Sequence, residues 1–493
     1  MVGDLGAAGA RGALVTSGSQ AIAMLVRVAG LILLARLVEP AAFGAVAIAT
    51  SVALLVSNVV GMGLTMAASQ HSGLSQPAKS SLLLLNLALG VVGSAFILII
   101  ARPASDLYGI PPLLPVLLAM AVVPLATGLQ TQFRVEMIVR LRFSPLAISE
   151  VLAQVVALAA AIILALADMP YAALAAQPIT YSLALLMMLV VQAKWRPGKP
   201  GLWTTEVRDV LRVGVNIFGM NAARNLSRTA LIPMLGLFAS PAALGSFDRA
   251  QQLSVVPVTL FVDQLQRVAI PILAKLRTQA SRALRLLQES QLAITYVAGA
   301  MFACLFGVGG SLFVVLLGEE WAFAGQIFAA LAVGAFFRAL SQSTQWMFVG
   351  GGLSRQGLIF TSIGQPIIVV LTLVAAPVSI VFGAWVNSVA WFIYWIACVI
   401  VVARAMSWSA AALLAAPFRA LALFVVPIGV ASHIVTHQIT GSPLLQLTFG
   451  TLGGILAGTL ALLLPTTRRD VAQIRALVRV GLRRRDDGEE KAA

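Results

Sequence analysis

The sequence predicts an all-α, polytopic membrane protein that crosses the bilayer about fourteen times. Of its 493 residues, 60% are hydrophobic and only 10% are charged, whereas soluble domains are near half apolar and a quarter charged. This composition excludes a soluble enzyme and a disordered chain. A span needs about 20 apolar residues, so fourteen spans leave room for short loops and one tail. No separate soluble catalytic domain fits.

Apolar runs of sufficient length mark the spans, and short connections separate them. The predicted spans are 14–37, 42–68, 81–101, 113–132, 145–167, 171–193, 210–238, 243–273, 291–317, 321–349, 356–376, 378–403, 412–435 and 443–465. An even number of spans places both termini on one side of the membrane. In the last span, Gly450, Gly454 and Gly458 are expected to allow close helix packing.

The positions of lysine and arginine orient these spans. The net charge is +15, from 33 Lys+Arg against 18 Asp+Glu, and basic residues concentrate in cytoplasmic loops of membrane proteins. With the basic tail in the cytoplasm, Arg36 and Arg102 are the only loop cations on the opposite side. The charge is therefore a topology signal, and we expect no nucleic-acid partner.

An internal repeat divides the chain into two halves of the same orientation. Arg27 is followed by Pro-Ala-Ala-x-Gly from Pro40, and Arg228 is followed by the same pattern from Pro241, at one common offset. Parallel repeats of this kind occur in transporters, with the substrate site expected between them. The predicted parts are an N-terminal six-helix bundle (1–200), a C-terminal six-helix bundle (201–405), two extra C-terminal spans (406–465) and a basic cytoplasmic tail (466–493).

Four short motifs follow one another along most of the chain. They are Ala35-Arg36-Leu37 with Pro40 and Phe43-Gly44, Arg140-Leu141-Arg142-Phe143 with Leu146-Ala147 and Glu150, Leu244-Gly245-Ser246-Phe247-Asp248-Arg249-Ala250 with Pro257, and Leu317-Gly318-Glu319-Glu320-Trp321. In their order and spacing the chain resembles the polysaccharide transporters, the Wzx-like oligosaccharide flippases of the multidrug/oligosaccharidyl-lipid/polysaccharide exporter superfamily. Phe247 departs from the family, which usually has Tyr there.

The resemblance implies a function and a location. The chain is then expected to flip an undecaprenyl-diphosphate-linked oligosaccharide, the repeat unit of an O-antigen, exopolysaccharide or capsule, across the bacterial inner membrane. Its expected partners are this lipid-linked glycan, membrane lipids, and the glycan polymerase and glycosyltransferases of the same pathway. The alternatives are a lipid II-type flippase, a cation or drug antiporter of the superfamily and, from another class, a membrane glycan polymerase or ligase.

Charges within the spans independently indicate an anionic substrate. An arginine at the centre of a lipid-facing helix costs roughly 2.5–3.5 kcal/mol, so such residues must face a wet cavity, pair with an acid or reach an interface. The acidic partners that the sequence offers within the spans are Asp248 and Asp263, which leaves an excess of positive charge. Arginine suits phosphate because its planar fork binds two oxygens of one oxyanion at once. The arginines concerned are Arg27, Arg224, Arg228, Arg249, Arg267 and Arg338.

Arg27, Arg224 and Arg228 are the predicted diphosphate contacts. Arg224 and Arg228 are four residues apart and share one helix face, which Asn221 and Asn225 extend. Arg27 is the repeat counterpart of Arg228. The alternative interpretation is that these arginines reach an interface or form structural ion pairs.

Other polar residues complete the predicted site. The glycan and diphosphate cavity is expected to include Arg249, Arg267, Arg338, Gln20 and Gln345. Asp263 precedes Arg267 by four residues, the favourable order for a helical ion pair; alternatively, Asp248 or Asp263 couples transport to a proton or sodium gradient. We expect no other cofactor, no metal ligands and no catalytic residues, so the chain is not predicted to be an enzyme.

Overall fold

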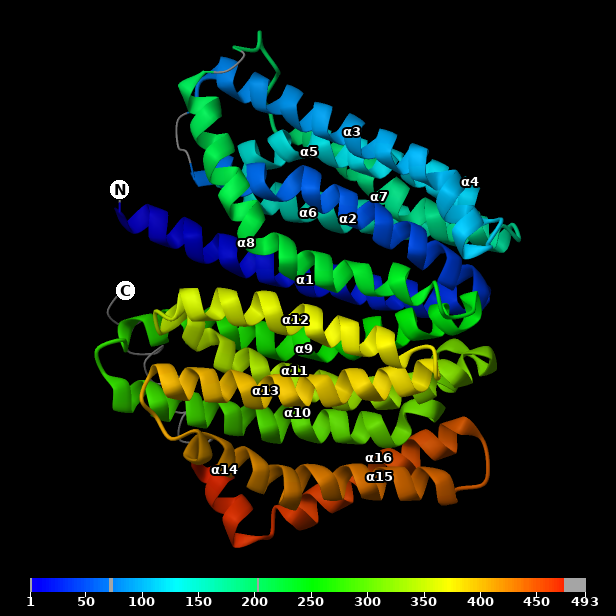
Figure 1. The fold of residues 1–493 in the computed structure, drawn as a ribbon, viewed down its shortest axis with the longest axis vertical. Coiled ribbons are helices and arrows are strands. Elements are labelled where there is room, and N and C mark those ends of the chain that lie inside the picture. The colour runs from blue at the N-terminus through cyan, green and yellow to red at the C-terminus, as the bar shows by residue number, and fades with distance from the viewer. Residues whose placement is uncertain (1, 71–73, 202–203, 474–493) are drawn as a thin grey trace. The chain divides into compact units, whose positions relative to one another are not determined.

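The computed structural model describes residues 2–70, 74–201 and 204–473, and the secondary structure of these residues consists of helices joined by short connections, with no strand among them (Figure 1). Helices of 18 residues or more dominate, as the apolar runs of the sequence predict. The predicted all-α fold class is therefore confirmed.

Twelve of the fourteen predicted spans coincide with helices that are long and apolar enough to cross a membrane, counted over the described residues. The other two predicted spans, 210–238 and 243–273, fall on helices of 31 and 35 residues. Several side chains of these two helices lie outside the described residues. A multi-pass membrane protein follows, while the count of fourteen stays a prediction.

The helices pack into two compact units, Met1–Asp248 and Arg249–Ala493. The first unit contains α1 (Val2–Leu37), α2 (Pro40–Gln70), α3 (Gln76–Tyr108), α4 (Leu113–Met120), α5 (Val122–Val139), α6 (Phe143–Leu166), α7 (Pro170–Gln192), α8 (Thr205–Leu235) and the start of α9 (Pro241–Lys275). Because α8 packs along α2, this division falls later than the predicted boundary at residue 200. The predicted division into repeated six-helix bundles stays a prediction.

The second unit continues α9 and adds the remaining helices. They are α10 (Ala280–Leu317), η1 (Glu319–Trp321), α11 (Ala322–Gly350), α12 (Ser354–Ala375), α13 (Ile380–Ala405), α14 (Ala410–Ala420), η2 (Leu421–Val425), α15 (Val426–Gln438) and α16 (Pro443–Ala461). Residues 465–473, most of which the sequence assigns to the basic tail, are also helical. The rest of the predicted tail, residues 474–493, lies outside the described residues.

Local chemistry fixes where several helices begin and end. Ser75, Thr204 and Ser379 each cap a helix, because their side-chain oxygens accept hydrogen bonds from backbone N–H groups three residues later. Gly109 ends α3 in the left-handed conformation, with φ of 63°, which glycine adopts without a steric penalty.

Small residues let helices of the first unit approach one another closely. On α6, the buried face consists of Ser149 and a row of alanines at Ala147, Ala153, Ala157, Ala161 and Ala165. This helix packs against α1 and α7. Such rows allow helix backbones to pack closely. In membranes this close packing matters because the hydrophobic effect does not drive helices together there.

The last span uses glycines in the same way. Gly450, Gly454 and Gly458 are buried on α16, and α16 packs against α10 and α15. A Cβ on Gly454 would lie 2.8 Å from Cys304 Sγ, and one on Gly458 would lie 3.1 Å from Ile428 Cδ1. These contacts agree with the expected use of the three glycines in close helix packing.

The two copies of the Pro-Ala-Ala-x-Gly motif meet each other at the starts of α2 and α9. A Cβ on Gly44 would overlap the carbonyl oxygen of Pro241, and a Cβ on Gly245 would overlap the carbonyl oxygen of Pro40. The contact is therefore reciprocal: each copy supplies a glycine to the other's proline carbonyl. The sequence repeat corresponds to a symmetric crossing of two helix N-termini.

We predict that Gly44→Ala or Gly245→Ala lowers the free energy of unfolding by about 1–3 kcal/mol, because the added methyl group forces two helix backbones apart. Thermal unfolding of the purified protein in detergent checks this. The control is Gly310→Ala in α10, where no atom lies within 4 Å of the position that the added methyl group would take. Equal melting temperatures for all three variants would contradict the close crossing.

Candidate functional site

The predicted site residues lie on four helices. They are Gln20 and Arg27 on α1, Asn221, Arg224, Asn225 and Arg228 on α8, Asp248, Arg249, Asp263 and Arg267 on α9, and Arg338 and Gln345 on α11. The residues on α1 and α8 belong to the first unit, and those on α11 belong to the second.

Several of these residues have side chains outside the described part of the structure. They are Asn221, Arg224, Arg228, Asp263 and Arg267. Their backbone positions within α8 and α9 are described, and helical spacing places residues 221, 224, 225 and 228 on one face of α8. The roles assigned to these side chains stay predictions.

Arg27 lies at a polar cluster formed by three neighbouring helices of the first unit. Its side chain is exposed and is close enough to Tyr181 on α7 to interact with it electrostatically. Arg134 on α5 and Glu150 on α6 form an ion pair of 3.0 Å beside the same tyrosine. Since this pair is neutral, Arg27 gives the cluster a net positive charge.

A buried hydrogen bond extends this cluster along α5. Gln130 donates from Nε2 to the backbone oxygen of Ser182 at 2.5 Å, and both residues are buried. The interaction ties α5 to α7 directly beside Tyr181. The polar groups around Arg27 are therefore held in place by contacts between helices.

Glu136 on α5 is a second acid in the first unit, and no pattern in the sequence pointed to it. Its side chain is 2% exposed and forms ion pairs with Lys79 Nζ on α3 at 2.8 Å and with Arg140 Nη2 at 3.2 Å. One carboxylate therefore pairs with two cations, which leaves one positive charge in excess. The interaction fastens α3 to α5.

The expectation that Asp248 and Asp263 are the acidic partners within the spans is incomplete, because Glu150, which pairs with Arg134, also lies within a predicted span, 145–167. The apolar run that predicts a span ends at residue 132, but α5 continues to Val139. Arg134 and Glu136 thus lie in a helix and not in a loop. Both residues are paired: Glu136 with Lys79, and Arg134 with Glu150.

In the second unit, Arg338 is held by an aromatic ring. Its guanidinium carbon lies 5.5 Å from the ring centroid of Trp391 on α13, a geometry in which the ring face stabilises the cation. Gln345, two turns further along α11, donates from Nε2 to Ser341 Oγ at 3.5 Å. Arg338 and Gln345 therefore share one helix but do not contact each other through these interactions.

Residues around the unit boundary are partly or fully buried. Asp248 is buried, Asn225 and Arg249 are half-buried, and all three interact with other groups. Phe247 is fully buried. A tyrosine hydroxyl at position 247 would need a hydrogen-bond partner in this core, which the phenylalanine avoids.

Another ion pair lies at the start of the segment beyond α16. Asp470 accepts from Arg419 Nη2 at 2.6 Å and from the Tyr296 hydroxyl at 3.0 Å, and it is buried. This pair fixes residues 465–473 against α10 and α14. We assign it a structural role, because both of its charges are already satisfied.

The chain has relatives of known family. A family model described as polysaccharide biosynthesis protein matches residues 33–326. The succinoglycan biosynthesis transport protein ExoT of Rhizobium meliloti (strain 1021) is 22% identical over 61% of this chain, and the aligned region spans 61% of ExoT's own length. The teichuronic acid biosynthesis protein TuaB of Bacillus subtilis (strain 168) is 24% identical over 67% of this chain and 69% of its own.

Solved structures share the fold. The lipid II flippase MurJ in an inward closed conformation matches with a TM-score of 0.71 at 11% identity, over 91% of this chain and 99% of MurJ. An inward-facing multidrug resistance MATE family transporter of the MOP superfamily matches with a TM-score of 0.57 at 16% identity, over 80% and 96%. ExoT and both structures are named as transporters or flippases, which agrees with the prediction that the chain is not an enzyme.

We predict that Glu136→Gln lowers the free energy of unfolding by about 3 kcal/mol, because it leaves Lys79 without its buried counter-charge. Thermal unfolding in detergent measures the loss. Adding Lys79→Gln to Glu136→Gln removes the unpaired charge, so the double variant is expected to be more stable than the sum of the two single losses.

The matched control for this prediction is Asp106→Asn. Its partner Arg102 and Asp106 itself are 74% and 64% exposed, so breaking their pair is expected to cost about 1 kcal/mol at most. An equal loss for Asp106→Asn and Glu136→Gln would show that the burial of Glu136 has no energetic consequence.

Proposed function

Since the chain belongs to the polysaccharide biosynthesis protein family, we propose that it is a flippase for an undecaprenyl-diphosphate-linked oligosaccharide. The substrate is the repeat unit of an O-antigen, an exopolysaccharide or a capsule. Transport crosses the bacterial inner membrane by alternating access, in which the site opens first to one side and then to the other.

The position of Arg27 carries this proposal. Arg27 is exposed at a cluster whose other charged residues, Arg134 and Glu150, neutralise each other. The remaining positive charge suits an anion, and a guanidinium can bind two oxygens of a diphosphate. On α8, Arg224 and Arg228 share a face and are proposed to bind the same group.

The proposed glycan contacts are polar residues near the arginines. Gln20 lies two turns from Arg27 on α1, and Gln345 lies two turns from Arg338 on α11. The other members are Asn221 and Asn225, which extend the arginine face of α8, and Arg249 and Arg267 on α9. Coupling to a proton or sodium gradient through Asp248 or Asp263 stays a further proposal, as do contacts with a glycan polymerase and glycosyltransferases.

The proposed orientation places both termini in the cytoplasm. It rests on the concentration of loop lysines and arginines on one side of the predicted spans. Labelling of single cysteines introduced near the two termini would test it directly.

The rival functions differ in the charge that their substrates need. A cation or drug antiporter needs an acidic site, whereas Glu136 and Glu150 are paired with lysine and arginine. A lipid II-type flippase shares the diphosphate chemistry and differs only in the glycan. A membrane glycan polymerase or ligase would need a sizeable outer loop with catalytic charges, and the predicted outer loops are short.

We predict that proteoliposomes containing the wild-type protein flip a short-chain polyprenyl-diphosphate oligosaccharide, and that Arg27→Ala, Arg224→Ala and Arg228→Ala each slow flipping by about tenfold or more. Loss of a charge-assisted hydrogen bond of about 1.5–3 kcal/mol has this effect. Lysine at the same positions restores part of the rate, because it keeps the charge but loses the planar fork.

Arg102→Ala is the control, because Arg102 and its ion-pair partner Asp106 are both exposed. Wild-type rates in all three alanine variants would move the diphosphate site toward Arg249, Arg267 and Arg338. Failure of the wild type with several glycans, together with gradient-driven efflux of small cations, would favour the antiporter.

A further inference from the structure

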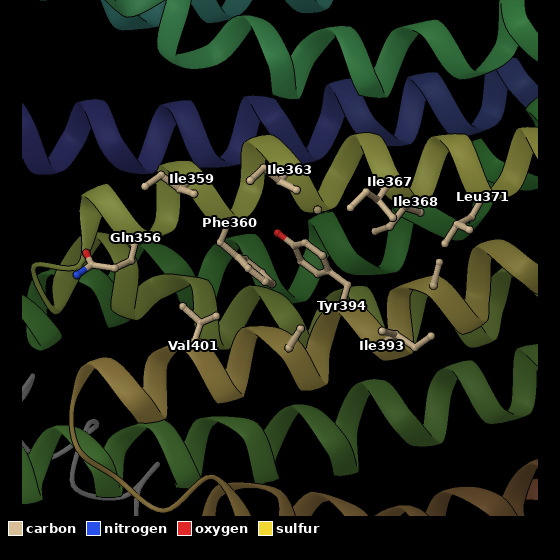
Figure 2. A pocket seen from close by; sticks show the side chains of 13 residues that line it. Gln356, Ile359, Phe360, Ile363, Ile367, Ile368, Leu371, Ile393, Tyr394 and Val401 are labelled. Atoms are coloured by element: carbon tan, nitrogen blue, oxygen red, sulfur yellow. The ribbon is translucent and has the colours of Figure 1, made fainter.

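An apolar groove runs between α12 and α13 in the second unit. Its volume is about 490 Å³, and α12 lines it with a stripe of aliphatic side chains at Ile359, Ile363, Ile367 and Leu371. Figure 2 shows Gln356 at one end of this stripe and Leu371 at the other. The fifteen-residue separation corresponds to about 22 Å along the helix, most of the thickness of the hydrocarbon core of a bilayer.

Small residues and one aromatic pair create the hollow. Gly364 has no Cβ, and one placed there would lie 2.6 Å from Tyr394 Cε2, so α12 can approach the Tyr394 ring only at a glycine. Tyr394 and Phe360 pack with ring centroids 4.8 Å apart. Ala390 and Ala397 on α13 add little bulk to the wall. The shape of the groove therefore follows from the packing of α12 against α13.

The two ends of the groove differ in charge. Gln356 and the exposed Arg355 lie in the first turn of α12. Arg277 donates from Nε to the Gly350 oxygen at 2.9 Å, and its guanidinium lies near Gly352 in the turn before α12. The opposite end, at Leu371, is aliphatic. A ligand that fits both ends is a hydrocarbon chain with an anionic head at the α12 start.

The wall of the groove is also connected to a predicted substrate residue. Tyr394 packs against Trp391 with 5.3 Å between ring centroids, and Arg338 lies over the ring of the same tryptophan, 5.5 Å from its centroid. A surface that only contacts bulk lipid has no comparable reason to be linked through one tryptophan to a residue of the predicted substrate site. This continuity favours the substrate's own chain over a bulk membrane lipid.

We propose that the groove between α12 and α13 binds the polyprenyl chain of the transported lipid, with its diphosphate end toward Arg355 and Arg277 before the diphosphate moves to the arginines on α1 and α8. This inference rests on the proposed function, because it assumes a lipid-linked substrate. The groove would hold part of the chain in a fixed place while the glycan head moves.

Photolabelling of the full-length protein in nanodiscs of phosphatidylethanolamine and phosphatidylglycerol tests the proposal. The probe is a polyprenyl diphosphate with a diazirine in the chain, and labelled peptides are mapped by mass spectrometry. We expect labelling within 356–371 and 390–401 that unlabelled undecaprenyl diphosphate displaces and that added phosphatidylglycerol does not. Equal displacement by both lipids would overturn the proposal and identify the groove as a bulk-lipid surface.

A pair of variants on one helix provides the matched control. Ile363→Trp fills the groove, whereas Val370→Trp adds the same ring to α12 outside the groove, at a site of nearly equal exposure (57% and 55%). We expect Ile363→Trp to reduce displaceable labelling by about tenfold and Val370→Trp to leave it unchanged. Unchanged labelling in both folded variants would overturn the proposal.

The outcome is separable from that of the flipping assay. If the wild type flips the glycan but its groove labelling is not displaceable, the proposal that the groove binds the polyprenyl chain is wrong and the proposed flippase function is supported. If labelling is displaceable but no glycan is flipped, the groove binds polyprenyl diphosphate and the proposed flippase function is wrong. The competition measurement on the wild type decides the question even if Ile363→Trp does not fold.

Discussion

The requirement that a charge inside an apolar bundle be paired determines how the first unit is held together. Glu136 is almost fully buried and binds Lys79 and Arg140, and Arg134 binds Glu150. An unpaired ion in such surroundings costs several kcal/mol, so these contacts fix α3, α5 and α6 relative to one another. They also assign a structural role to most of the cations in this region. Arg27 then supplies the excess positive charge of the cluster around Tyr181. Its position beside a neutral ion pair is therefore the reason for proposing it as an anion contact.

The helical architecture could be predicted from the sequence because the periodic and compositional signals are strong. Twelve predicted spans lie on membrane-length helices of the described chain. The ends of helices were less predictable. A run of apolar residues stops at the first charged side chain, so the predicted span ends at residue 132, although α5 continues to Val139. Glu136 was missed for the same reason, since only tertiary packing shows that a lysine from α3 reaches it. The charge on an isolated segment cannot reveal a partner that lies far along the chain.

The Pro-Ala-Ala-x-Gly repeat indicates a tertiary contact as well as the topology of the chain. The duplication suggested two related halves, and the structure shows that the two motif copies touch each other through Gly44 and Gly245. Each glycine makes room for the other copy's proline carbonyl. Both copies therefore have the same steric requirement, since a Cβ at either glycine would overlap a carbonyl oxygen of the other copy. By contrast, the predicted roles of Arg224, Arg228, Asp263 and Arg267 depend on side chains outside the described residues.

A lipid-linked diphosphate has an anionic head and a hydrocarbon chain, which need different surroundings. Different helices of this protein provide the cationic residues and the apolar groove. Cationic residues proposed for the head lie on α1, α8 and α11, whereas α12 and α13 provide a groove with aliphatic walls. Placing an arginine inside that groove would expose it to hydrocarbon, and placing the hydrocarbon chain beside the arginines would remove water from them. Arg338 avoids both costs because the Trp391 ring contacts its guanidinium and also packs against Tyr394 of the groove wall. An aromatic ring suits that position, since its face stabilises the cation and its edge packs against apolar neighbours. One helix, α13, can therefore border a charged residue and a hydrocarbon chain without mixing them.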